Sequence, residues 1–189
     1  MLVQSTSLTL KDRTTPPDPN RRRISFKSVT TSDPAPNQIA MPSRATAGDP
    51  TQGGSTGGGA TLQVYNSNGS GELVTVTLPA TGWAAMDDAP TPRGYKYKSA
   101  LPTDAITRVT LRPNSIRIRG GKGSWAYTLN ETSQGRVAVR FTMGSAFRWC
   151  ADSPAKSSGN PPSTASNDKV DKFVGARRTP PPASCPALP

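Results

Sequence analysis

Alternation of single apolar and single polar residues constrains this chain more than any other feature. In the segment SIRIR (115–119), Ile116 and Ile118 alternate with Arg117 and Arg119. Successive side chains of a β-strand point to opposite faces of a sheet. The pattern therefore predicts a half-buried strand, with the isoleucines facing a core and the arginines facing solvent.

The same period of two recurs in several other segments, as in ELVTVTLPA (72–80) and RVAVRFTM (136–143). We expect about nine or ten strands, and the one candidate helix is NDKVDKFVGA (167–176). The expected strands cover residues 8–11, 21–29, 60–66, 72–80, 95–99, 106–112, 115–119, 124–129, 136–143 and 146–150. The residues predicted to face the core are Ile24, Phe26, Leu62, Val64, Val74, Val76, Leu78, Val109, Leu111, Ile116, Ile118, Val137, Val139 and Phe141.

Glycine and proline separate these segments. The 189 residues include 17 glycines and 20 prolines, and only 33% are hydrophobic, so short strands must be joined by turn-rich connections. We predict a single all-β domain over residues 1–189, an antiparallel β-sandwich or jelly roll with long Pro/Gly-rich loops. Residues 30–60 are expected to form one such loop, because they cannot bury enough apolar surface to fold alone. Asn68-Gly69 is expected to form a tight hairpin turn.

Positive charge dominates the sequence. The formal net charge is +11, which favours anionic partners such as nucleic acid or acidic polysaccharide. Between residues 106 and 150 there are eight lysines and arginines and one acidic residue. The arginines expected on one solvent-facing ladder are Arg108, Arg112, Arg117, Arg119, Arg136 and Arg140. Two interpretations stay open: the face is solvated and keeps a basic protein soluble, or it binds an anionic polymer.

Aromatic residues offer a second candidate binding surface. Trp83 lies among small residues in PATGWAAMDD, a loop-like setting, so it is the first candidate for an exposed ring that stacks on a sugar or a base. Tyr95 and Tyr97, which alternate with Lys96 and Lys98, are the second candidate. Packing in the core is the commoner role for tryptophan in a sandwich. No recognised nucleic-acid-binding module is present.

Histidine is absent, which removes Ser-His-Asp and Cys-His nucleophiles and histidine zinc sites. GGKGS (120–124) lacks the spacing and the following helix of a phosphate-binding loop. Asp87 and Asp88 fit a turn better than a calcium site. We expect no catalytic residues, no metal and no cofactor. The apolar runs are far shorter than the roughly 20 residues of a membrane-spanning helix, so no membrane span is expected.

The two cysteines are Cys150 and Cys185. An even count in a small, core-poor domain is typical of an exported protein with one disulfide, although two reduced cysteines are also common in cytosolic proteins. We predict the disulfide, which would tie the Pro-rich tail (151–189) back to the last core strand. The N-terminal residues lack the basic and apolar regions of a signal peptide.

Six strings form a set that spans nearly the whole chain: RRRISFKS, ATLQVYNSNGSGE, GYKYKS, LNETSQGRVAVRFTMGS, RWCADSPAKSSGNPPSTASNDKVDKF and ASCPALP. Together they resemble an uncharacterised family of exported β-rich modules from environmental bacteria. The resemblance implies export and supports a bond between Cys150 and Cys185. It implies no activity.

The function that we expect is an exported, non-catalytic binding module at the cell surface or outside the cell. Its partner would be an anionic or neutral polysaccharide, held by the arginine ladder and the exposed aromatics. One alternative is a structural subunit whose Pro/Gly segments wrap copies of itself in an extracellular assembly. Another is a β module that binds nucleic acid through non-specific charge.

Overall fold

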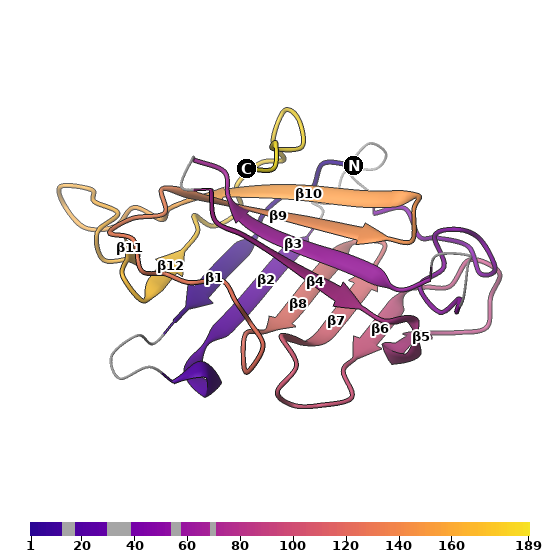
Figure 1. Ribbon diagram of the computed structural model, residues 1–189. Coiled ribbons are helices and arrows are strands. Elements are labelled where there is room, and N and C mark those ends of the chain that lie inside the picture. The colour runs from indigo at the N-terminus through magenta and orange to yellow at the C-terminus, as the bar shows by residue number, and fades with distance from the viewer. Residues whose placement is uncertain (13–17, 30–38, 54–57, 69–70) are drawn as a thin grey trace.

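Two antiparallel β-sheets form the two layers of the computed structural model (Figure 1), which describes residues 1–12, 18–29, 39–53, 58–68 and 71–189. One sheet has eight strands and the other has four. The predicted all-β sandwich is therefore confirmed. No helix in these described ranges is long and apolar enough to cross a membrane.

The eight-stranded sheet contains both early and late parts of the chain. Its order is β11 (Asp168–Lys169), β12 (Lys172–Val174), β1 (Ser7–Lys11), β2 (Arg23–Val29), β8 (Ser115–Gly120), β7 (Ile106–Arg112), β6 (Tyr95–Lys98) and β5 (Trp83–Ala85). The four-stranded sheet has the order β10 (Phe147–Pro154), β9 (Arg136–Met143), β3 (Ala60–Asn66) and β4 (Leu73–Leu78). Two short 3₁₀ turns, η1 (Pro19–Arg21) and η3 (Ala80–Gly82), precede β2 and β5.

The core fills the space between the two sheets. Ile116 and Ile118 of β8 are fully buried, as the alternation predicted. All the other residues predicted to face the core are buried too, except Val76, which is partly exposed. Val76 lies on β4, the edge strand of the smaller sheet, where neighbouring strands cover only one side.

Residues 124–129 were predicted to be a strand, and this is wrong. Trp125, Tyr127 and Leu129 are buried as the alternation indicates, but their backbone joins no ladder. The Thr128 N–H donates to the Glu72 carboxylate, and the Leu129 carbonyl accepts from the N–H of Asp171 at 2.9 Å. These partners satisfy the Thr128 N–H and the Leu129 carbonyl without a neighbouring strand.

The candidate helix at residues 167–176 is also wrong. This segment forms the hairpin of β11 and β12, and β12 pairs with β1, so that Phe173 lies opposite Leu10 and is fully buried. Pairing with an existing sheet outweighs the local helical pattern. Strand β5 was not anticipated, because its sequence is short and loop-like.

Both ends of the chain lie beside β10 (Figure 1). Leu2 forms a parallel bridge with Cys150, and the Met1 ammonium donates to the Arg148 carbonyl at 2.6 Å. Cys150 is bonded to Cys185, which confirms the predicted disulfide. The C-terminal tail is thereby held over the outer side of the four-stranded sheet.

The described part of the long loop, residues 39–53, is held by side chains. Ile39 is buried in the core. The Asp49 carboxylate accepts from the backbone N–H groups of Ala45 and Thr51, each at 2.9 Å, and from the Thr51 hydroxyl at 2.7 Å. Residues 30–38 and 54–57 of the loop, and Gly69 of the expected hairpin turn, lie outside the described residues.

Candidate anion-binding face

The six arginines expected on one ladder belong to two different sheets. Arg108 and Arg112 lie on β7, and Arg117 and Arg119 lie on β8, so these four extend from the outer face of the eight-stranded sheet. Arg136 and Arg140 lie on β9 of the four-stranded sheet. Because the two sheets pack with their apolar faces together, their outer faces point in opposite directions. The prediction of a single six-arginine ladder is therefore wrong.

The outer face of the larger sheet carries additional cations. We define the basic face as the outward lysines and arginines of β1, β2, β8, β7 and β6, which are Lys11, Arg23, Lys27, Arg117, Arg119, Arg108, Arg112, Lys96 and Lys98. These five strands contain no aspartate or glutamate. None of the ion pairs found among the described residues includes a member of this set.

Several of these cations are direct cross-strand neighbours. Arg119 of β8 lies opposite Arg108 of β7, and Arg108 in turn lies opposite Lys98 of β6. On the other side of β8, Arg117 lies opposite Lys27 of β2. Like charges that face each other across a ladder destabilise a sheet by about a few tenths of a kcal/mol per pair. An anion bound between them would relieve this repulsion.

Hollows occur at both ends of the basic face. One, of about 580 Å³, lies where β2 begins and β8 ends, and Arg23, Arg108 and Arg119 line it together with Lys98. A second, of about 440 Å³, lies at the opposite ends of the same strands, and Lys27, Arg112 and Arg117 contribute to it. A third, of about 320 Å³, is lined by Met86, Arg93, Lys96 and Arg112. The face is therefore a row of basic hollows more than a flat surface.

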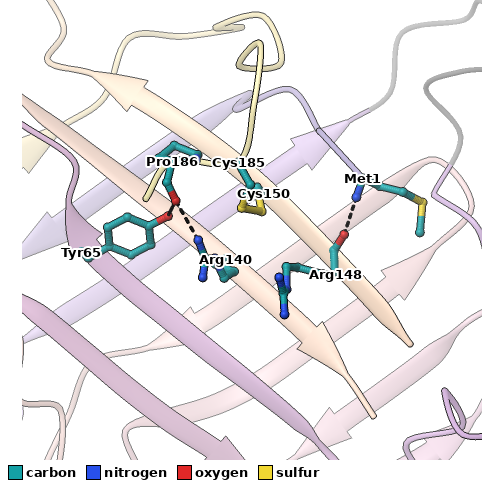
Figure 2. The surroundings of a disulfide bond; sticks show 7 residues. All are labelled: Met1, Tyr65, Arg140, Arg148, Cys150, Cys185 and Pro186. Atoms are coloured by element: carbon teal, nitrogen blue, oxygen red, sulfur yellow. Dashed lines mark hydrogen bonds between the residues drawn. A yellow bond between two sulfur atoms is a disulfide. The ribbon is translucent and has the colours of Figure 1, made fainter. Parts of the chain in front are cut away.

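Arg136 and Arg140 are occupied by contacts within the protein. Arg136 forms an ion pair with Asp152 of the neighbouring strand. The Arg140 guanidinium donates to the Pro186 carbonyl at 2.7 Å and lies 5.7 Å from the centre of the Tyr65 ring (Figure 2). The Tyr65 hydroxyl donates to the same carbonyl at 2.7 Å. The disulfide places the tail here, so Arg140 holds the tail against the sheet, whereas Arg136 links β9 to β10.

The aromatic candidates do not form an exposed platform. Trp83 is 6% exposed, Tyr97 is 5% exposed and Tyr95 is fully buried, so the prediction of stacking rings is wrong. Trp83 pairs with Tyr97 across β5 and β6, with ring centres 5.3 Å apart. Burial raises the pKa of Tyr95 to about 12, and its hydroxyl donates to the Pro42 carbonyl at 2.9 Å. In the YKYK strand it is the lysines that face solvent.

Only four members of the basic face were predicted as binding residues from the sequence, namely Arg108, Arg112, Arg117 and Arg119. Arg23 and Lys27 alternate with Ile24 and Phe26 in RRRISFKSV, so the period of two that identified the arginines of β8 could also have identified them. Lys96 and Lys98 were noticed only as neighbours of tyrosines. The missing signal was the pairing of strands, which places all these segments in one sheet.

The acidic residues were also considered as metal ligands, within the part of the chain that the structure describes. Within the described ranges no group of histidine, cysteine, aspartate and glutamate side chains could hold a metal ion. Asp87 accepts from the backbone N–H of Ala89 at 3.3 Å and from that of Arg93 at 3.1 Å, as in a turn.

Comparisons with protein-family models, with curated proteins and with solved structures find no match. The resemblance to exported β-rich modules therefore stays a prediction.

Proposed function

We propose that this protein is an exported, non-catalytic module that binds an acidic polysaccharide on the basic face. The observation that carries the proposal is the set of five adjacent strands without an acidic residue, whose outward cations form no ion pair among the described residues. Guanidinium groups make charge-assisted, often bidentate hydrogen bonds to carboxylate and sulfate. A polymer that repeats such groups would match the repeated cations.

The buried aromatics favour an anionic ligand over a neutral one. All three tryptophans and all four tyrosines of the chain are buried. Neutral sugars and single-stranded nucleic acids are commonly held by stacking on exposed rings. Six of these rings lie in the core and Tyr65 is covered by the tail, so the basic face offers charge and hydrogen bonds as its means of recognition.

The disulfide supports export. Disulfides form and persist in oxidising surroundings outside the cytosol, and Cys150 and Cys185 account for both cysteines of the chain. Acidic polysaccharides are abundant in the same surroundings. Nucleic acid remains an outcome that the experiment can detect.

Affinity chromatography on immobilised heparin, polygalacturonate, and single- and double-stranded DNA tests the proposal. The wild type is compared with Arg117→Ser/Arg119→Ser, and with the control Arg148→Ser/Arg177→Ser, which removes the same charge from exposed positions off the basic face. We expect the wild type to bind the polysaccharides at low salt and to elute as screening increases. The face variant should elute earlier and the control should follow the wild type.

Two results would contradict the proposal. If the wild type passes through both polysaccharide columns at low salt, the basic face is only solvated. If the face variant and the control elute together, net charge and not the basic face governs retention. Preferential retention on DNA would favour a nucleic-acid partner instead.

A further inference from the structure

The hollow of about 580 Å³ at one end of the basic face differs from a plain charged surface. Its lining combines the cations Arg23, Lys98, Arg108, Arg119 and Lys122 with the apolar residues Ala100, Leu101 and Pro102. The volume lies in the range of about 300–1,000 Å³ that is typical of small-molecule sites. A pocket of this kind suits a ligand that has both an anionic group and an apolar surface.

The floor of the pocket is fixed by an irregularity in the β7–β8 ladder. The register shifts between Ile106 and Arg108, as in a β-bulge, and bulges often re-aim side chains beside functional sites. Gly120 ends β8 at this point, where a Cβ atom would lie 2.2 Å from the Ala105 carbonyl oxygen. The Thr107 hydroxyl donates to the Arg119 carbonyl at 3.2 Å. The backbone of Gly120 therefore lies too close to that of Ala105 for any side chain at position 120.

Two arginines of the pocket are already neutralised by the protein. Arg22 donates to Asp12 at 2.8 Å and to the Trp125 carbonyl at 2.9 Å, and Arg21 forms an ion pair with Asp18 at 3.3 Å. The five cations named above take part in none of the ion pairs found among the described residues. No acidic side chain is among the described residues that line the pocket. The positive charge is thus available to a ligand.

The apolar wall is preformed by its own loop. The Leu101 N–H donates to the Asp104 carboxylate at 3.1 Å, and the Leu101 carbonyl accepts from the Ser99 hydroxyl at 2.8 Å. The Leu101 residue is nevertheless 58% exposed, the largest exposed fraction among the exposed large hydrophobics of the described chain. An ordered loop that presents an exposed leucine beside cations is suited to cover an apolar part of a ligand.

We infer that this pocket binds one acidic sugar unit of the polymer, with its carboxylate or sulfate among Arg23, Arg108 and Arg119 and the C–H face of its ring against Leu101. The inference rests on the proposed function and names the place where the polymer is recognised. The other cations of the basic face then attract the rest of the polymer electrostatically, with less specificity and with a strength that falls as salt is added. A phosphate chain has no apolar ring face, so the wall contributes nothing to binding it.

Titration calorimetry with short oligosaccharides and with polyphosphate tests the inference. The probes are a short heparin oligosaccharide, which carries sulfate, a short oligogalacturonate, which carries only carboxylate, and inorganic polyphosphate. The variants are Arg108→Gln/Arg119→Gln in the pocket, the charge-matched control Arg112→Gln/Arg117→Gln at the other end of the face, and the uncharged change Leu101→Asn. All these side chains are exposed, so the variants should fold, and denaturant unfolding checks this.

We expect the pocket pair to weaken binding of at least one oligosaccharide about tenfold or more, because charge-assisted contacts are lost, and the control pair to weaken it much less. Leu101→Asn should weaken the same oligosaccharide several-fold and leave polyphosphate binding unchanged. A response of the oligogalacturonate shows that carboxylate is recognised, and a response of the heparin oligosaccharide alone shows that sulfate is required.

The inference and the proposed function fail in different ways. If the wild type binds neither oligosaccharide, the proposed function is wrong. If it binds them but the two arginine pairs weaken binding equally, binding is spread over the face and the pocket inference is overturned. An effect of Leu101→Asn that is absent, or equal for oligosaccharide and polyphosphate, overturns it as well.

Discussion

Arg108 lies directly opposite Arg119 in the ladder between β7 and β8, and both residues are exposed. A sheet selected for stability alone would place an opposite charge or a neutral residue at one of these positions. The pair also lines one basic hollow from two strands. The two guanidinium groups repel each other because they lie close together, and the same closeness lets both of them contact one anionic ligand.

Replacing one member of this pair by an acid should stabilise the fold and weaken binding. We expect Arg119→Glu to raise the free energy of unfolding by about a few tenths of a kcal/mol at low ionic strength, because a like-charge pair becomes an opposite-charge pair. The gain should shrink as salt is added. Urea unfolding at two salt concentrations, with heparin elution in parallel, measures both effects. A loss of stability at low salt would contradict the prediction.

Arg140 should matter for the tail and not for binding. We expect Arg140→Ser to leave retention on heparin close to that of the wild type, because this side chain faces the tail on the other sheet. The same change should speed reduction of the disulfide between Cys150 and Cys185, since Pro186 loses one of its two side-chain donors. Thiol release under a mild reductant measures this rate. If Arg140→Ser leaves the rate of disulfide reduction unchanged and elutes earlier from heparin, Arg140 acts in binding and not in holding the tail.

Removing the disulfide should affect stability alone. In the chain-entropy model, closing a loop over the 35-residue separation contributes about 3–4 kcal/mol. We therefore expect Cys150→Ala/Cys185→Ala to lower the free energy of unfolding by about that amount. Denaturant unfolding measures the loss, and chromatography on heparin provides the control, because the basic face belongs to the other sheet. A matching loss of affinity would show that the tail supports the basic face.

Glu72 should give the stability a dependence on pH. Burial raises the pKa of its carboxyl above the ordinary 4.5, assisted by the nearby carboxylates of Glu131 and Asp12 and opposed by hydrogen bonds from Thr128. A raised folded-state pKa means that the folded protein holds this proton more tightly than the unfolded chain does. The contribution of Glu72 is therefore greatest below pH 4.5 and is lost as the pH rises through the folded-state pKa.

Glu72→Gln isolates this contribution. The amide keeps an oxygen that accepts from the Thr128 N–H but does not ionise. We expect the stability of the variant relative to the wild type to increase as the pH rises from below 4.5 towards neutrality. Urea unfolding across this range measures the difference, and a difference that is constant with pH would contradict the prediction.

The core could be predicted because burial follows a local rule. Ile116, Ile118 and Val109 each alternate with polar or basic neighbours, and alternation alone assigns a residue to one face of its own strand. Even Trp125 and Tyr127 follow the rule, although their segment joins no sheet. Local periodicity therefore indicates which side chains face the core, whatever the partner strand is.

The candidate site could be predicted only in part, because it depends on pairing between distant segments. Arg136 alternates like Arg117, but β9 pairs with β3 and β10, which turns its outer face away from β8. Trp83 was placed at the surface because its neighbours are small, whereas the ladder between β5 and β6 brings it against Tyr97. Neither pairing leaves a signal within the strand itself.

The link between Cys150 and Cys185 also determines how the molecule responds to mechanical tension. A force that pulls the two ends of the chain apart enters the C-terminal side of the fold at Cys150, and the intervening residues form a covalent ring that the force cannot extend. At about 3.3–3.6 Å per extended residue, the 35-residue separation between the cysteines corresponds to roughly 120 Å of chain. This length cannot be extended by the force until the disulfide is reduced. Strands β11 and β12 lie inside this ring, so they are never pulled directly, whereas Met1–Val3 at the other end can be peeled from β10.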